Sequence, residues 1–224
     1  ADRMLSVGIT GTNGKTTTAH LVHAALHKCA MNPLLLGTAG VRFEQQHWPS
    51  ARTTPESSEL QSLLASAVAA GAKGFVMEVS SHALVLERVA GMTFDVAVFT
   101  GLSQDHLDFH PSMDDYYAAK ALLFSAAHAR RAVINVETEW GRRLAAECQL
   151  PITTYATSGP ADWTAREVQP LPAGRRVAVL ANSPGTAVLG VWAQVIVIAG
   201  PCSAESEAQV HATAAAVKRA GAKM

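Results

Sequence analysis

The stretch "GITGTNGKTTTAHL", residues 8–21, constrains the fold of this chain more than any other feature of its sequence. It follows the apolar run Met4–Ile9, which predicts a buried strand, and it leads into a helical pattern over Thr16–Lys28. A glycine-rich turn between a strand and a helix directs backbone N–H groups and the positive end of the helix dipole at one place. The sequence therefore predicts a phosphate-binding loop inside an α/β domain.

Gly14, Lys15 and Thr16 form the Gly-Lys-Thr end of a P-loop. Lys15 is expected to reach the outer phosphates of a nucleotide, and the Thr16 hydroxyl to bind Mg²⁺. The usual pattern has a glycine where this chain has Ile9, and the alternative is a glycine-rich turn that binds nothing. The expected nucleotide-binding residues are Gly11, Thr12, Asn13, Gly14, Lys15, Thr16 and Thr17.

Two further segments offer candidate metal ligands. Glu78 ends the apolar run "GFVMEV", and a carboxylate there either holds Mg²⁺ or pairs with a lysine or arginine. His106 lies in "SQDHLDFH", just past the run "DVAVFT", at the end of a parallel strand where ligands bind. It is either a ligand of a second metal or a loop histidine with local hydrogen bonds.

Short apolar runs that alternate with helical patterns predict a P-loop-containing, mostly parallel sheet with helices on both faces. Thr54 and Pro55 are expected to open a helix as N-cap and first residue, and Ser112 to cap another. Further expected elements are a strand over 132–136 and a helix through Cys148. After about residue 150 the runs "WTAREVQ", "RRVAVLA" and "TAVLGVW" predict a short antiparallel segment, followed by a C-terminal strand–helix unit.

The overall composition excludes several classes of protein. Eighteen basic residues balance eighteen acidic ones, so we expect neither a nucleic-acid partner nor an anionic membrane. The three cysteines are far apart and odd in number, which argues against a disulfide framework. We find no apolar run long enough to insert into a membrane and no leader, so a cytoplasmic protein is expected.

Five motifs occur in one order: "GTNGKTTT", "TTP" (Thr53–Pro55), "MEVSSHAL", "DHLDFH" and "YYAAK" (Tyr116–Lys120). Over residues 4–170 the chain thereby resembles the central ATP-binding domain of the Mur ligases. The resemblance implies an ATP-dependent acid–amine ligase of peptidoglycan precursor synthesis. Its substrates would be UDP-N-acetylmuramoyl-L-alanyl-D-glutamate, activated as an acyl phosphate, and a diamino acid or lysine.

The same resemblance assigns roles to individual residues. Lys15, His106 and Lys120 would be catalytic, with Thr16, Glu78 and His106 holding Mg²⁺. The family lysine that Lys120 matches is carbamylated, whereas the residues alone favour a solvated helix lysine. The positions expected to contact the UDP-sugar peptide are Thr53, Thr54, Ser80 and Arg88.

Residues 195–224, "VIVIAGPCSAES…", resemble instead the opening strand and helix of the TIM-barrel 3-deoxy-D-arabino-heptulosonate-7-phosphate synthases. We therefore expect three parts: an incomplete Mur-type domain over 1–176, a join over 177–194 and a strand–helix fragment in which Cys202 is an ordinary thiol. The chain would be only the ATP-binding part of a ligase. The alternatives are a non-catalytic nucleotide-binding module or composite chain, and a fragment of the second family.

Overall fold

The computed structural model describes residues 4–104, 109–171 and 174–181. The chain forms two compact units, residues 1–154 and 155–224. The first unit contains the P-loop and every described residue of the candidate site. The predicted strand "TAVLGVW", His106 and the strand–helix fragment 195–224 lie outside the described residues.

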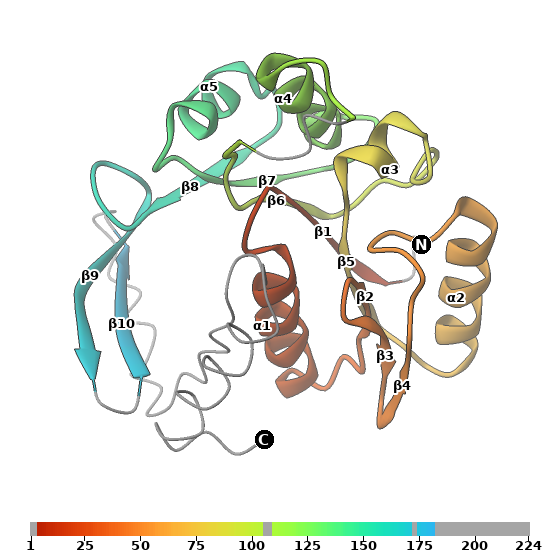
Figure 1. Ribbon diagram of the computed structural model, residues 1–224. Helices are drawn as coiled ribbons and strands as arrows, with labels where there is room; N and C mark the ends of the chain where they lie inside the picture. The colour runs from red at the N-terminus through yellow and green to blue at the C-terminus, as the bar shows by residue number, and fades with distance from the viewer. Residues whose placement is uncertain (1–3, 105–108, 172–173, 182–224) are drawn as a thin grey trace, which may run out of the picture. The chain divides into compact units, whose positions relative to one another are not determined.

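The first unit is built on a mostly parallel sheet (Figure 1). Its strands are β1 (Leu5–Thr10), β2 (Leu34–Gly37), β3 (Gly40–Phe43), β4 (Gln46–Trp48), β5 (Gly74–Glu78), β6 (Val96–Phe99) and β7 (Ala132–Asn135). The order across the sheet is β7-β6-β1-β5-β2-β3-β4. The first five strands in this order are parallel to one another, and β3 and β4 extend the sheet as antiparallel strands. The predicted fold class is therefore confirmed, with an antiparallel edge that the sequence did not indicate.

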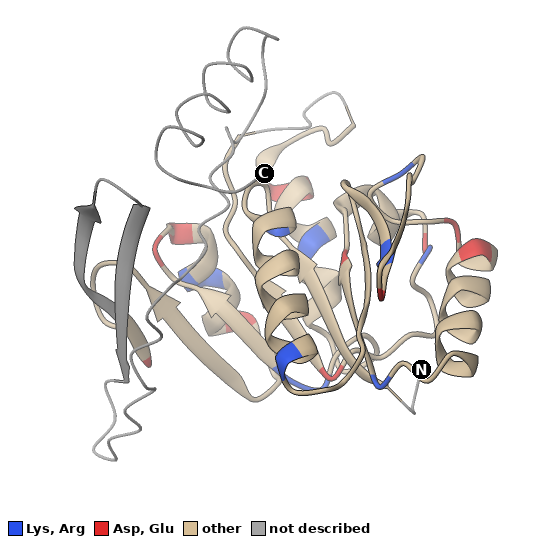
Figure 2. Cartoon of the chain, turned by 90° about the horizontal axis from the view of Figure 1, so that it is seen from below, with Lys and Arg blue, Asp and Glu red and all other residues tan. Residues whose placement is uncertain are grey.

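Helices cover both faces of this sheet, because alternate residues of each buried strand point to opposite sides. Val76 packs with α1 (Lys15–Lys28) on one face, whereas Phe75 and Met77 pack with α2 (Ser57–Ala69) on the other. The second face also holds α3 (Ser81–Val85), α4 (Met113–Ala121), the short 3₁₀ helix η1 (Leu122–Phe124) and α5 (Glu139–Glu147). In Figure 2 the charged positions lie mainly on helices and connections, while the central strands are mostly uncharged.

The second unit contains most of the short strands predicted after residue 150. β8 (Ile152–Ala156) leads into it, and β9 (Trp163–Leu171) and β10 (Gly174–Ala181) pair antiparallel, as expected. β8 pairs with the start of β9 in parallel, through Tyr155 and Trp163. The antiparallel prediction is thus confirmed for the two strands "WTAREVQ" and "RRVAVLA".

The predicted helix start at Thr54 is wrong. α2 begins at Ser57 with Glu56 as its N-cap residue. The Thr54 hydroxyl instead donates to the backbone oxygen of Glu78 at 2.9 Å and accepts from the Ser80 N–H at 3.1 Å. Thr54 is therefore bound to the end of β5 and is not available to cap a helix. By contrast, the Ser112 hydroxyl accepts from the Asp115 N–H at 3.1 Å, so the predicted cap of α4 is confirmed.

Among the described residues, no helix combines the length and apolar character needed to cross a lipid bilayer.

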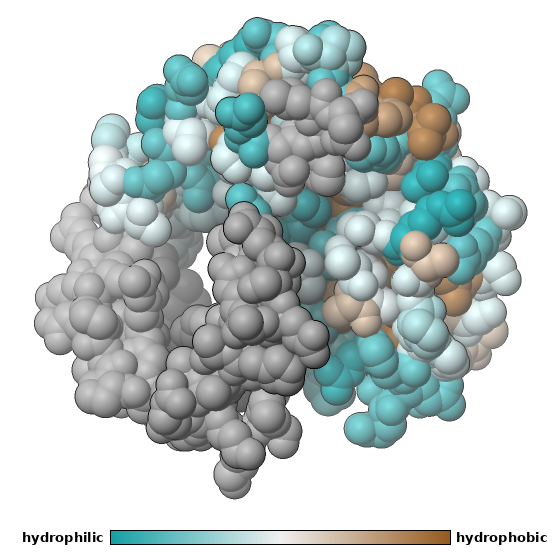
Figure 3. All heavy atoms as spheres, viewed as in Figure 1, coloured by the Kyte–Doolittle hydropathy of each residue, from teal (hydrophilic) through white to brown (hydrophobic). Residues whose placement is uncertain are grey.

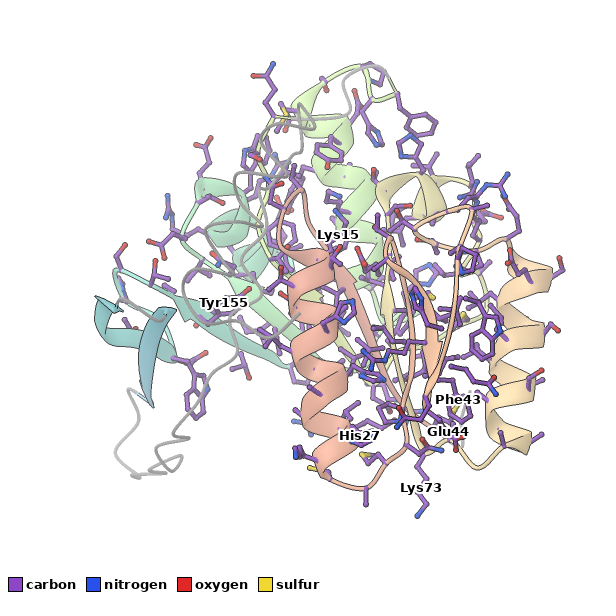
Figure 4. The ribbon with its side chains drawn as sticks, turned by 60° about the horizontal axis from the view of Figure 1, so that its bottom comes forward. Lys15, His27, Phe43, Glu44, Lys73 and Tyr155 are labelled. Carbon is purple, nitrogen blue, oxygen red and sulfur yellow. The ribbon has the colours of Figure 1, made fainter. Side chains whose placement is uncertain are left out.

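Two of the histidines on α1 are in environments that disfavour their charged form. His23 is buried, with Nε2 at 3.1 Å from the Pro33 oxygen, and burial lowers its pKa below 6.5. Burial also lowers the pKa of the half-buried His20, an effect that Glu78 opposes and that Arg42 and His47 reinforce. Figure 4 shows Lys15 at the start of α1 and His27 near its end, with Phe43, Glu44 and Lys73 at the same end of the sheet as His27.

We expect Leu60→Ala to lower the free energy of unfolding by about 2–5 kcal/mol, because Leu60 is fully buried between α2 and the sheet. Urea denaturation measures this change. Leu21→Ala is the matched control, since Leu21 on α1 is 46% exposed, and it should change stability by only about 0.5 kcal/mol. Equal losses in the two variants would contradict the described packing of α2.

We expect the protein to lose stability as the pH falls through 6.5, because His20 and His23 have lower pKa values in the folded state. The unfolded chain then binds more protons, so acidification favours unfolding, and the contribution is fully present only above this pH. The difference in unfolding free energy between pH 7.5 and 5.5 should shrink in the His20→Gln, His23→Gln double variant. His27→Gln, at an exposed position of the same helix, is the control and should change that difference much less than the double variant does.

Candidate functional site

The P-loop lies at the carboxyl ends of the parallel strands, where the sheet register brings β1, β5 and β6 together. Ile9 pairs with Glu78, and Thr10 with Phe99. Gly11 then has φ +146°, and a Cβ at this position would overlap the Thr100 hydroxyl. Only glycine fits between the loop and the end of β6. The loop opens into α1 at Gly14, which leaves the N–H groups of the first helical turn directed at the loop.

Hydrogen bonds hold the P-loop against the segment that follows β6. The Thr12 N–H donates to the Gly101 oxygen at 2.9 Å, and the Thr12 hydroxyl donates to the Ser103 oxygen at 3.1 Å. The Ser103 N–H donates back to the Thr12 hydroxyl at 3.0 Å, and the Thr100 hydroxyl donates to the Asn13 oxygen at 2.6 Å. The loop is thereby fixed in shape before any phosphate binds.

Lys15 folds back over the loop that precedes it. Its Nζ donates to the backbone oxygens of Gly11 at 2.8 Å and Thr12 at 2.9 Å. These bonds place the ammonium above the concave side of the loop, where a phosphate bound by the loop N–H groups would lie. The predicted phosphate-binding lysine is thus located at the loop, although its role stays a prediction.

Glu78 and Thr16 meet beside the loop. The Thr16 hydroxyl donates to Glu78 Oε2 at 2.9 Å, and the Glu78 side chain is 1% exposed. No lysine, arginine or histidine of the described residues lies within ion-pair distance of Glu78, so the alternative of a charge-paired carboxylate finds no partner among them. A buried carboxylate and a hydroxyl at this distance suit Mg²⁺, which takes few protein oxygens and completes its shell with phosphate and water.

His106, the second predicted metal ligand, lies outside the described residues. The described residues include no group of three or more histidine, cysteine or acidic side chains that could hold a metal by themselves. His110, from the same motif, is buried and has Nε2 at 2.9 Å from the Ser81 hydroxyl. It therefore supports α3.

Lys120 is buried, with 1% of its surface exposed, so the interpretation as a solvated helix lysine is wrong. Its Nζ donates to the Gly11 oxygen at 3.1 Å and lies 4.4 Å from the centre of the Tyr116 ring. Tyr116 and Lys120 are one helical turn apart, so they share the face of α4 that packs toward the P-loop. The residue type alone thus placed Lys120 in solvent, whereas it is buried beside the P-loop; its catalytic role stays a prediction.

A pocket of about 520 Å³ opens next to these groups. All four residues predicted to contact a substrate line it, together with two lysines of the site: Lys15, Thr53, Thr54, Ser80, Arg88 and Lys120. The sequence analysis missed the other lining residues, which are Thr38, Ala51, Arg52, Ser81 and His82. The run "LLLG" before Thr38 was the one available signal, because a residue that directly follows a buried strand lies at the ligand edge of a parallel sheet.

Arg88 is held in this pocket by an ion pair and a hydrogen bond. It donates to Glu56 Oε1 at 2.9 Å and to the Thr54 oxygen at 3.4 Å. Its Nε is buried and has no hydrogen-bond partner in the described structure. Because an unsatisfied buried donor is costly, this N–H is suited to an acceptor brought by a ligand.

The short helix α3 has two different sides beside the pocket. Its first residues, Ser81 and His82, line the pocket, whereas Val85 is 46% exposed and the following Leu86 is 54% exposed. Figure 3 shows apolar side chains gathered at the surface in this region. Ser80 caps the helix by accepting from the Ala83 N–H at 3.1 Å, which fixes the hydroxyls of this segment at the pocket.

Comparison with known proteins gives a consistent result. A family model described as the Mur ligase middle domain matches residues 9–190, a range that includes most of the expected join over 177–194. A UDP-N-acetylmuramoyl-L-alanyl-D-glutamate–2,6-diaminopimelate ligase of Streptomyces coelicolor is 48% identical over 193 residues. The match covers 81% of this chain and 38% of that protein.

Solved structures agree with the sequence matches. A ligase of the same name superimposes with a TM-score of 0.73 at 29% identity and covers 80% of this chain and 37% of its own. A MurF ligase from Thermotoga maritima, solved in complex with ADP, shares the fold with a TM-score of 0.55 at 16% identity, over 80% of this chain and 38% of its own. This chain thus spans less than half the length of these relatives. From the family match over 9–190 and the shared fold, the chain belongs to the Mur ligase family, and the matched region is the family's middle domain.

Proposed function

We propose that this chain binds Mg-ATP at residues 11–17 and supplies the phosphoryl-transfer half of an acid–amine ligase. The proposal rests on one observation: the P-loop adjoins a pocket that is lined by cationic side chains. Lys15 belongs to both, and Arg52 and Arg88 line the same cavity. Such a pocket favours a substrate that carries negative charge.

The substrate would be UDP-N-acetylmuramoyl-L-alanyl-D-glutamate, whose terminal carboxylate accepts the γ-phosphoryl group. A carboxylate oxygen forms a bond to the γ-phosphorus, the bond from that phosphorus to the β,γ-bridging oxygen breaks, and ADP leaves. An amine nitrogen then attacks the acyl carbon, phosphate leaves, and the amine loses a proton. Names of the relatives favour 2,6-diaminopimelate as the amine over lysine.

The residues of the site would divide this work. Two anions must approach each other in the first step, and Lys15 offsets their repulsion at the outer phosphates. Thr16 and Glu78 would hold Mg²⁺, which supplies further charge neutralisation, and His106 would hold a second ion. Thr53, Thr54, Ser80 and Arg88 would orient the UDP-sugar peptide, with Arg88 Nε free to donate to it.

Lys120 would act as a carbamate. Its neutral amine attacks the carbon of CO₂, an N–C bond forms and a proton leaves, so that a cation becomes an anion. An anion between the P-loop and the pocket is stabilised by bound metal, whereas an ammonium there is repelled by it. The position of Nζ, buried against Gly11 and Tyr116, supports this assignment because it lies beside the phosphate loop.

The wider organisation is also a proposal. Residues 1–176 would form the ATP-binding domain of a longer cytoplasmic ligase, and residues 195–224 a packing strand and helix without a chemical role. The alternative is a nucleotide-binding module that binds ATP but ligates nothing. Release of phosphate from ATP, measured with and without the UDP-sugar dipeptide, separates the two: stimulation by the dipeptide supports the ligase.

We expect Lys15→Ala to weaken binding of Mg-ATP about 10- to 100-fold, since a charge-assisted hydrogen bond contributes about 1.5–3 kcal/mol. Isothermal titration calorimetry measures the affinity. Lys28→Ala is the matched control, because Lys28 is exposed at the other end of the same helix. Equal affinity in wild type and Lys15→Ala would refute nucleotide binding at this loop.

A further inference from the structure

We propose that Thr38, in the turn between β2 and β3, is a positioning residue that holds the Glu78 carboxylate in place for the divalent cation. The inference rests on the proposed function, because it concerns the Mg²⁺ that would accompany ATP. It adds a residue that directly follows β2, a strand that carries none of the predicted site residues.

Thr38 binds both oxygens of the Glu78 carboxylate. Its backbone N–H donates to Oε1 at 2.9 Å, and its hydroxyl donates to Oε2 at 3.2 Å. Oε2 also accepts from the Thr16 hydroxyl at 2.9 Å. The described donors to this carboxylate therefore come from β2 on one side and from the P-loop helix on the other, which fixes the plane of the carboxylate.

Gly37 leaves the room that this arrangement requires. A Cβ at residue 37 would overlap Oε1 of Glu78 and approach the carboxylate carbon to 2.8 Å. Any side chain at this position would therefore move the carboxylate away from the Thr38 N–H and from Thr16. Gly37 and Thr38 together form a cradle for the Glu78 carboxylate. Gly37 leaves space for the carboxylate, and Thr38 donates hydrogen bonds to it.

The cradle also connects the carboxylate to the pocket. Thr38 Oγ1 lies 3.0 Å from Thr53 Oγ1, and both residues line the cavity. A threonine hydroxyl has one proton, so when Thr38 donates to Glu78 it must accept from Thr53. A chain of hydroxyl groups thus runs from the proposed substrate wall, through Thr38, to the proposed metal ligand.

Holding the carboxylate matters because groups that orient a metal ligand set the affinity for the metal. Loss of such an outer partner typically costs 10- to 100-fold in metal affinity. Without the Thr38 hydroxyl, Oε2 would keep only the Thr16 hydroxyl and Oε1 only the backbone N–H of residue 38, so the turn would hold the carboxylate by one bond in place of two. The carboxylate would then have to be reordered each time the cation binds.

The test is the gain in ATP affinity that Mg²⁺ produces, measured by calorimetry as the ratio of the dissociation constants in EDTA and in Mg²⁺. Thr38→Val keeps the shape of the side chain and removes the hydroxyl, and Thr38 is exposed, so the variant should fold. We expect Thr38→Val to reduce this ratio about tenfold, with ATP affinity in EDTA unchanged. Thr38→Ser restores the hydroxyl and should return the ratio close to the wild-type value.

Two further variants make the result specific. Gly37→Ala should also reduce the ratio, by displacing Glu78. Thr93→Val is the matched control: Thr93 donates to the Ala127 oxygen at 3.2 Å, away from the pocket, and its loss should leave the ratio unchanged. A wild-type ratio in Thr38→Val, or an equal loss of affinity with and without Mg²⁺, would overturn the inference alone. Absence of any Mg²⁺-dependent ATP binding in the wild type would overturn the proposed function, and this inference with it.

Discussion

The burial of the Glu78 carboxylate at the end of β5 is the constraint on which the candidate site depends. Taking a charge out of water is costly unless hydrogen bonds or an opposite charge compensate it. Here three groups donate to the carboxylate: the Thr16 hydroxyl, the Thr38 hydroxyl and the Thr38 N–H. Thr16 lies after β1 and Thr38 after β2. The fold must therefore place the ends of these two strands beside the end of β5 for the buried charge to be tolerated. A bound cation would complete that compensation.

The second constraint is the shape of the P-loop, which depends on β6 as much as on its own glycines. Gly11 fits closely against the Thr100 hydroxyl, and Thr12 is bonded to Gly101 and Ser103. The loop therefore needs little reorganisation to receive phosphate, and less of the binding free energy is lost in ordering it. The same segment after β6 leads toward the motif that contains His106, so the phosphate loop and the predicted second metal ligand belong to neighbouring strand ends.

The sequence predicted β1, β5, β6 and β7 of the parallel core, because these strands are continuous apolar runs with glycine-rich or polar ends, but it missed the short strand β2. It also located Lys15, Thr16 and Glu78, whose positions follow from the P-loop and from the end of a buried strand. It failed where tertiary contacts decide. The short strands β3 and β4 have no distinctive pattern, and Thr54 looks like a helix cap until β5 is placed beside it. Lys120 is buried because it packs against Gly11 of the P-loop, 109 residues earlier in the chain. No pattern in the sequence around Lys120 indicates that contact.

The charges of the pocket also follow from the way these elements meet. Arg88 is held by Glu56, which also contacts Arg52 at 3.3 Å, so one carboxylate serves two guanidinium groups and leaves excess positive charge at the wall. Lys15 adds positive charge at the P-loop, where its Nζ contacts the Gly11 oxygen. Among the described residues of the site, the two carboxylates are already engaged, Glu78 by Thr16 and Thr38 and Glu56 by arginines. A ligand that enters this pocket meets Lys15, Arg52 and Arg88, and phosphate and carboxylate groups are the chemical partners of such cations.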